Sequence, residues 1–116
     1  MKSLTLFLFS LLFVVDNQSA NGAVGLPAAP DRTFSIVVIP DTQHYKGRGT
    51  KADREKKSTE PVTNSVFAAY TDWIVANLER QRIVFVSHVG DIVDRNNREQ
   101  WAVARGNMDK FHGQVP

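Results

Sequence analysis

The chain has 116 residues, carries a formal net charge of +2 and contains no cysteine. This length suits one small domain at most, and the absence of cysteine excludes both a disulfide framework and a thiolate metal site. The hydrophobic share of 42% is ordinary for a globular protein and argues against disorder throughout the chain.

The N-terminal segment resembles a targeting sequence more than a part of the fold. Lys2 precedes an apolar run from Leu4 to Val15, and small polar residues follow it. At about 1.5 Å per residue, this run is too short to span a bilayer core of roughly 30 Å. The pattern predicts a signal peptide over residues 1–23, and therefore a secreted or periplasmic protein without a stable membrane span. The alternative is a buried N-terminal helix or a retained anchor.

Residues 24–33, which are rich in Gly, Pro and Ala, are predicted to be a linker. The apolar, β-branched run Phe34–Ile39 predicts a strand covered on both faces, as in a parallel sheet. A basic loop, residues 41–60, follows. No aromatic residue interleaves its charges after Tyr45, so we expect a solvated loop without a specific nucleic-acid partner. Beside a phosphate site, its charge would still attract an anionic substrate.

A helix is predicted to open at Pro61, where the missing N–H costs nothing. Its expected apolar face consists of Val62, Val66, Tyr70, Trp73, Ile74 and Leu78. Ile83–Val86 is predicted to be a second buried strand.

A second helix is predicted to start at Asn96 or Asn97 and to end at His112-Gly113. Gly106 weakens it by about 1 kcal/mol relative to Ala. Its expected apolar stripe consists of Trp101, Ala104, Met108 and Phe111.

The order strand, helix, strand, helix predicts the α/β class and the opening of a right-handed βαβ layered fold. Two parallel strands form a poor sheet by themselves, because such sheets are normally larger and covered on both faces. We therefore expect the sequence to be the first part of a longer protein, or of a longer ancestral design.

Polar residues follow both predicted strands at their carboxyl ends, which line the usual ligand crevice of an α/β fold. Asp41 follows the first strand and Asp91 the second. Between neighbouring strands about 4.8 Å apart, both carboxylates can reach one point, as a pair of divalent ions requires. Gly90 permits a tight turn, and Asp94 is positioned to support Asp91. Taken singly, each Asp is more often a turn former or a helix cap.

The two motifs together resemble the calcineurin-like metallophosphoesterases. "PDTQ" is followed about fifty residues later by "HVGDIVD". The pair is most similar to a secreted bacterial-type branch of the family with Asp-Thr-Gln at the first motif. The resemblance covers residues 34–116, about the first third of a typical family domain.

The resemblance implies a four-layer αββα fold of which residues 34–116 would form the N-terminal βαβα portion. It also implies two divalent metal ions (Mn, Fe, Zn, Mg or Ca). The family hydrolyses phosphate mono- or diesters with a metal-bound hydroxide.

Matched residue by residue, the resemblance implies that Asp41 binds the first metal and that Asp91 bridges the two. Gln43 stands where the family usually has a His ligand, and an amide oxygen would shift the preference toward Mn, Mg or Ca. Asp94 and His88 would support the site without binding metal.

The sequence contains no Gly-Asn-His motif and no match to the later His ligands of the family. We therefore expect these residues alone to have little or no activity. Two alternatives remain open. The chain is a non-catalytic, secreted module that binds metal or phosphate, or a purely structural α/β unit whose aspartates cap helices.

Overall fold

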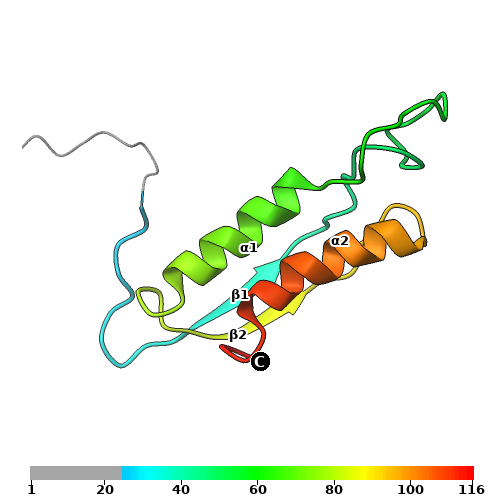
Figure 1. Ribbon diagram of the computed structural model, residues 1–116. Helices are drawn as coiled ribbons and strands as arrows, with labels where there is room; N and C mark the ends of the chain where they lie inside the picture. Colours follow the sequence, from blue (N-terminus) through cyan, green and yellow to red (C-terminus); the bar gives the residue numbers. More distant parts are fainter. Residues whose placement is uncertain (1–24) are drawn as a thin grey trace, which may run out of the picture.

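A computed structural model describes residues 25–116, so the predicted signal peptide lies outside the described residues. The elements run in the order β1 (Ser35–Ile39), α1 (Ser65–Asn77), β2 (Ile83–His88) and α2 (Arg98–Met108) (Figure 1). A short 3-10 helix, η1 (Asp109–Phe111), follows α2. The predicted α/β class and element order are confirmed. Among residues 25–116, no helix is both long and apolar enough to cross a membrane.

The two strands pair in parallel, with α1 as the connection between them. Ser35 pairs with Ile83 and Ile36 with Phe85, so an irregularity at this point leaves Val84 without a partner in the register. The predicted strand boundaries were off by one or two residues, which is the usual uncertainty at strand ends.

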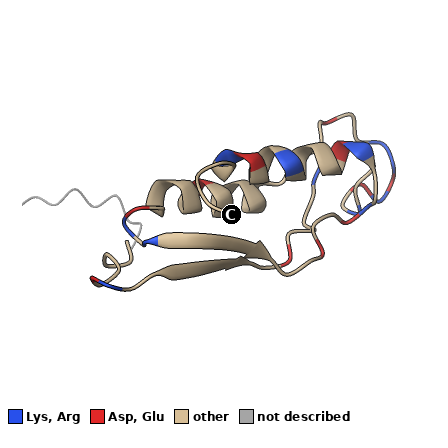
Figure 2. Ribbon diagram, turned by 90° about the horizontal axis from the view of Figure 1, so that it is seen from below, with Lys and Arg blue, Asp and Glu red and all other residues tan. Residues whose placement is uncertain are grey.

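Both helices lie on one face of the sheet (Figure 2). The side chains between the sheet and the helices form a single apolar core, because each element contributes its inward-facing residues to it. This core consists of Ile39, Phe67, Ile74, Ile83, Val86, Ala104 and Phe111.

The prediction that the first strand is covered on both faces was wrong for the described residues. Phe34, Ile36 and Val38 are 68%, 57% and 56% exposed. Alternate residues of a strand point to opposite faces, and residues 25–116 supply helices to only one of them. The sequence pattern therefore predicted an apolar strand correctly, but not a second covering layer.

The first helix begins at Ser65 and not at Pro61, as the sequence predicted. The later start is explained by backbone pairing of the residues just before the helix with the basic loop. Lys46 and Thr63 exchange two backbone hydrogen bonds, each 2.9 Å long, which hold Thr63 in an extended bridge. Asn64 then caps the helix, because its side-chain oxygen accepts the N–H of Phe67 at 2.9 Å.

Ile74 is buried and Leu78 packs against the core as predicted, but the rest of the buried face of α1 differs from the predicted one. Val66, Tyr70 and Trp73 each remain more than a third exposed, whereas Phe67 and Thr71 are fully buried. Phe67, Thr71, Ile74 and Leu78 fit a 3.6-residue period as well as the predicted set does. Thr71 tolerates burial because its hydroxyl donates to main-chain carbonyls one turn back, at 3.0 and 3.2 Å.

The second helix starts where it was predicted, with Asn97 as its N-cap. Ala104 and Phe111 are buried as expected, but Trp101 is exposed and donates its indole N–H to Asn96 at 2.8 Å. Gln100 and Asn107 take buried positions instead. The α-helix ends at Met108, because the chain tightens into η1 there, before the predicted end.

The described part of the predicted linker, residues 25–33, has no regular secondary structure, but it contacts the turn between α1 and β2. Ala29 donates its N–H to the carbonyl of Arg80 at 3.0 Å, and the Gln81 amide donates to the carbonyl of Pro27 at 2.9 Å. These bonds fasten the segment before β1 to the rest of the domain.

Asn64 makes one hydrogen bond more than an ordinary helix cap. Its contribution to stability can be measured with a pair of variants. Besides capping α1, its side-chain amide donates to the buried carbonyl of Thr42. We expect Asn64→Ala to lower the free energy of unfolding by roughly 2–4 kcal/mol, because the cap and the carbonyl's partner are both lost. Asn97→Ala, which removes only a cap, should cost about 1 kcal/mol. Urea denaturation measures both, and equal losses would contradict a second role for Asn64.

Candidate functional site

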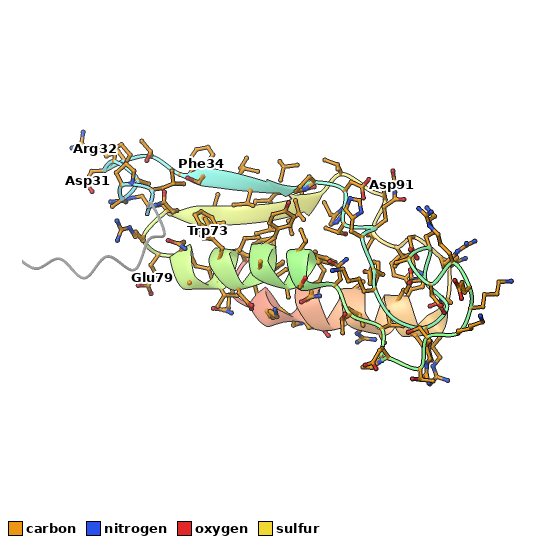
Figure 3. All side chains as sticks on the ribbon, turned by 90° about the horizontal axis from the view of Figure 1, so that it is seen from above. Asp31, Arg32, Phe34, Trp73, Glu79 and Asp91 are labelled. Carbon is orange, nitrogen blue, oxygen red and sulfur yellow. The ribbon has the colours of Figure 1, made fainter. Side chains whose placement is uncertain are left out.

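The turns that follow the two strands are joined by main-chain hydrogen bonds. The N–H of Thr42 donates to the carbonyl of Asp91 at 3.2 Å, and the N–H of Val89 donates to the carbonyl of Ile39 at 3.1 Å. Figure 3 shows Asp91 beyond the carboxyl ends of the strands. Asp41 and Asp91, two of the three predicted metal ligands, therefore sit on adjacent turns at one end of the sheet.

The second turn has an unusual backbone. Gly90 and Asp91 have φ angles of +109° and +51°, both in the region that favours glycine. Gly90 adopts this conformation without steric cost, as the sequence predicted, and Asp is among the residues that tolerate it best. Asp91 is exposed, and its carboxylate receives no hydrogen bond from residues 25–116.

In the first motif, the side-chain oxygens of Asp41 and Gln43 accept hydrogen bonds from nearby residues of the same loop. The Oδ1 atom of Asp41 accepts the N–H of Gln43 at 2.8 Å, which forms an Asx turn. The Oε1 atom of Gln43 accepts a hydrogen bond from Nζ of Lys51 at 3.1 Å. A metal ion would therefore compete with an ammonium group for the amide oxygen that the sequence offered as a ligand.

Thr42, between these two residues, is 1% exposed and connects the motifs through its side chain. Its Oγ1 atom lies 2.9 Å from Nε2 of His88 and donates to the carbonyl of Ile92 at 3.1 Å. The N–H of Gly90 donates to Nδ1 of His88 at 3.1 Å, so this network assigns the ring proton to Nε2. His88 thus contacts both turns through its two ring nitrogens. Its ring packs edge-on against Phe67, with ring centroids 5.6 Å apart.

Asp94 fastens the basic loop to α2. Its Oδ2 atom accepts the N–H of Lys51 at 2.9 Å, and its Oδ1 atom accepts from the side-chain amide of Gln100. Gln100, fully buried, in turn accepts the N–H groups of Asp94 and Arg95 at 3.0 and 2.9 Å. Asp94 therefore holds the second motif turn in place through both carboxylate oxygens.

A pocket of about 330 Å³ opens beside the first motif, lined by Asp41, Gln43, His44, Tyr45, Lys46, Lys51, Ala52 and Asp94. Tyr45 is 2% exposed, and its hydroxyl has no hydrogen-bond partner among residues 25–116. Burial raises the pKa of Tyr45; Asn64 opposes this shift, and the Asp94 carboxylate adds to it. The hydroxyl therefore stays protonated at neutral pH.

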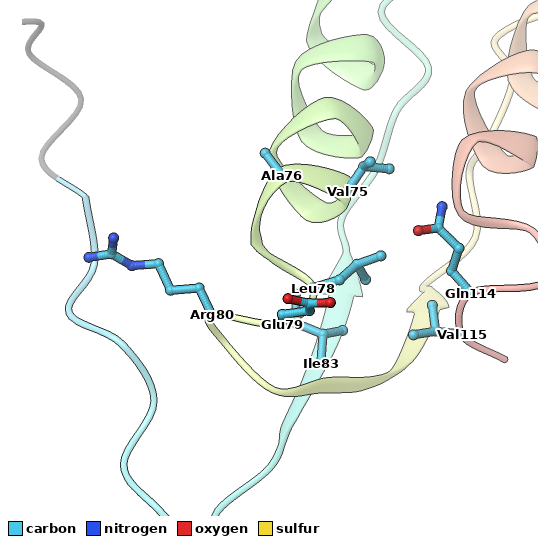
Figure 4. A pocket seen from close by; sticks show the side chains of 8 residues that line it. All are labelled: Val75, Ala76, Leu78, Glu79, Arg80, Ile83, Gln114 and Val115. Carbon is cyan, nitrogen blue, oxygen red and sulfur yellow. The ribbon is translucent and has the colours of Figure 1, made fainter.

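A second pocket, of about 530 Å³, lies at the opposite end of the sheet (Figure 4). Val75, Leu78, Ile83 and Val115 form its apolar lining, and Glu79 and Arg80 are its charged residues. None of the motif residues reaches it. The pocket beside Asp41 is therefore the one that brings sequence motifs and charge together.

Two carboxylates of the kind that bind hard cations lie at this end of the sheet. Asp41 and Asp91 offer carboxylate oxygens, the ligands that suit Mg²⁺, Mn²⁺ and Ca²⁺. Within the described part of the chain, however, no three His, Cys, Asp or Glu side chains come close enough to hold an ion. The arrangement fits the carboxylate share of an oxygen-rich site, and a complete shell needs further ligands.

Sequence reasoning missed Thr42, Lys51, Asn64 and Gln100, the polar residues that hold the site together. Their signals are weak, because a Thr inside a motif, a Lys inside a basic run and a Gln on a helix are each common on protein surfaces. Only their burial or their contacts distinguish them.

Comparison with known proteins finds no family model, no curated protein and no solved structure that matches this chain.

Gln100 should be needed for the second motif turn. Gln100→Leu leaves two N–H groups and the Asp94 carboxylate without their partner, so we expect a loss of about 2–4 kcal/mol in the free energy of unfolding. Glu99→Gln, which changes an exposed residue of the same helix, should cost less than about 1 kcal/mol. Chemical denaturation distinguishes the two, and similar losses would argue against the buried network.

His88 should make stability depend on pH. Burial lowers the pKa of His88 below its ordinary value of 6.5, and the charge of Asp41 partly opposes this shift. The unfolded chain therefore binds the proton more readily. Stability should be complete above about pH 6.5 and should fall as the pH decreases toward the lowered pKa of the folded state.

Urea midpoints between pH 5 and 8 test this expectation. His88→Gln should show a flatter profile over the same range, because the titrating ring is gone. Stability that increases on acidification through this range would overturn the assignment of a neutral His88.

Proposed function

We propose that the chain carries the first two metal-ligand motifs of a calcineurin-like metallophosphoesterase. The function would be metal-dependent hydrolysis of phosphate mono- or diesters. The observation that supports this most directly is the hydrogen bond from the Thr42 N–H to the Asp91 carbonyl. It joins the two turns that bear the motif aspartates, as one shared ion centre requires.

The exposed face of the sheet also supports the proposal. In a four-layer αββα fold, a second sheet would cover Phe34, Ile36 and Val38, which are exposed here. We therefore propose that β1, α1, β2 and α2 are the N-terminal βαβα portion of that fold.

In the proposed centre, Asp41 and Asp91 would hold the divalent ions through their free carboxylate oxygens. Asp94 and His88 would position the turns without touching the ions. When bound, such ions polarise a phosphoryl oxygen and lower the pKa of a water molecule that attacks phosphorus. Lys51, held beside Gln43, would offset negative charge on a phosphate ester that enters the pocket.

A second candidate is a secreted module that binds metal or phosphate without catalysis. It is favoured by the engagement of Gln43 with Lys51 and by the lack of a three-residue cluster of metal-binding side chains in residues 25–116. Such a site would hold one ion weakly.

Titration of the full chain with Mn²⁺, followed by electron paramagnetic resonance of the free ion, tests the proposed centre. Asp41→Asn and Asp91→Asn should each weaken Mn²⁺ binding by at least about tenfold, because each removes a charged ligand. Asp72→Asn removes a carboxylate from the exposed side of α1 and should leave binding unchanged. An equal effect of Asp72→Asn would show that the ion is held only by diffuse charge.

Hydrolysis of p-nitrophenyl phosphate with added Mn²⁺ tests the hydrolase directly, and low turnover that disappears in Asp91→Asn would support it. Because these residues alone are expected to have little or no activity, the number of Mn²⁺ ions bound per chain separates the two candidates. Two ions favour the hydrolase, and one weakly bound ion favours the binding module.

A further inference from the structure

A hollow of about 540 Å³ lies in the basic loop, next to the candidate site. Five cationic side chains line it, namely Arg48, Lys51, Arg54, Lys56 and Arg95. We refer to it as the basic hollow. Figure 2 shows Lys and Arg gathered in the loop and at the start of α2, at the same end of the molecule as the carboxyl ends of the strands. Its volume falls within the range of roughly 300–1,000 Å³ typical of small-molecule sites.

The positive charge of the basic hollow is only partly offset. Arg48 pairs with Glu99, but Lys51, Arg54, Lys56 and Arg95 form no ion pair within residues 25–116. Asp53 is the one acidic residue in the lining that the structure describes. Anionic ligands are therefore the chemical class that the hollow attracts.

Asp53 uses its carboxylate to shape the loop. The carboxylate accepts the N–H groups of Gly49, Lys57 and Ser58 at 3.0 to 3.1 Å. The Gly49 bond is the main reason that the pKa of Asp53 is lowered. The Asp53 carboxylate therefore fixes the backbone of the loop through these three hydrogen bonds. The basic side chains extend from this fixed backbone.

The loop is also fixed at its base. The Arg48 N–H donates to the carbonyl of Glu60 at 3.0 Å, next to the Lys46–Thr63 bridge. Gly47, between these contacts, has a φ of +102°, and a Cβ atom there would come within 2.2 Å of the Pro61 carbonyl oxygen. The cationic groups are therefore presented by an anchored loop and not by a mobile tail.

Lys51 connects the basic hollow to the candidate site, because it lines both the hollow and the pocket that contains Asp41. A ligand with one phosphate near Asp41 would place a neighbouring anionic group beside Lys51. Of the residues that the structure describes, none that lines the hollow is aromatic, so these residues offer no stacking surface of the kind that nucleic-acid bases require. The lining favours a small, densely charged molecule.

We propose that the basic hollow binds the second phosphate group of a small substrate that carries at least two phosphates, with the first phosphate beside Asp41 and Asp91. This inference rests on the proposed function for the placement of the first phosphate. Arg and Lys side chains recognise phosphate oxygens through charge-assisted hydrogen bonds.

Equilibrium dialysis of the full chain against pyrophosphate, in EDTA to remove divalent ions, tests the basic hollow without the metal centre. Pyrophosphate should bind at least about threefold more tightly than orthophosphate, because it can contact more than one cationic group. Lys56→Gln and Arg95→Gln should each weaken pyrophosphate binding by about two- to fivefold, and the triple variant with Arg54→Gln by at least about tenfold.

Lys57→Gln is the matched control. Lys57 belongs to the same loop but pairs with Glu55 and does not line the hollow. Its substitution should leave the affinity within about twofold of the original. A control effect as large as that of Lys56→Gln would overturn the proposal, as would the absence of any preference for pyrophosphate.

Asp91→Asn separates this proposal from the metal-centre proposal. In EDTA, pyrophosphate binding should be unchanged or tighter in Asp91→Asn, while Mn²⁺ binding in a separate titration is weakened. Unchanged Mn²⁺ binding in Asp91→Asn, with pyrophosphate binding retained, would contradict the metal centre alone. Loss of pyrophosphate binding in Asp91→Asn, with an unchanged circular dichroism spectrum, would contradict the basic hollow.

Discussion

Thr42 is the residue on which the organisation of the motif end depends. Its N–H reaches the turn at Asp91, its hydroxyl contacts His88 and Ile92, and its carbonyl accepts the amide of Asn64. A buried polar group is stable only when its hydrogen bonds are made, so this one residue forces three segments to meet at a single point. The adjacency of Asp41 and Asp91 follows from that meeting.

A second polar contact, centred on Gln100 and Asp94, extends this organisation to the basic loop and α2. Both networks are largely buried, and removal of one partner leaves the others unsatisfied. The five ion pairs among residues 25–116, in contrast, all involve substantially exposed side chains, and each contributes at most about 1 kcal/mol. The apolar core under the sheet and the buried hydrogen bonds at its end therefore account for the ordered site, and surface charge remains available for ligands.

Acidic and basic side chains occupy different segments at this end of the molecule. Asp41 and Asp91 lie on the turns that follow the strands, whereas the excess of Lys and Arg lies on the loop that leads to α1. Lys51 belongs to both regions, since its main chain is bonded to Asp94 and its ammonium group to Gln43. The proposed cation-binding centre and the proposed anion-binding surface are therefore compatible with each other, because Asp41 and Asp91 form no ion pair with the basic side chains of the loop.

The sequence by itself determined the α/β class, the order of the elements, the parallel strands joined by a helix and the start of the second helix. These features depend on local periodicity and on capping residues such as Asn97, which act within a few residues of chain. It also indicated a tight turn at Gly90, where the structure has a φ of +109° that glycine adopts freely.

Tertiary structure alone decided which face of α1 is buried, because two apolar faces fit the same period and only packing against the sheet selects Phe67 over Tyr70. It decided the start of α1, since the Lys46–Thr63 bridge joins residues that are distant in the sequence. It likewise decided that Gln43 contacts Lys51 and that Thr42 and Gln100 are buried. Contacts between segments far apart in the chain leave no local pattern, so no reading of the sequence alone contains them.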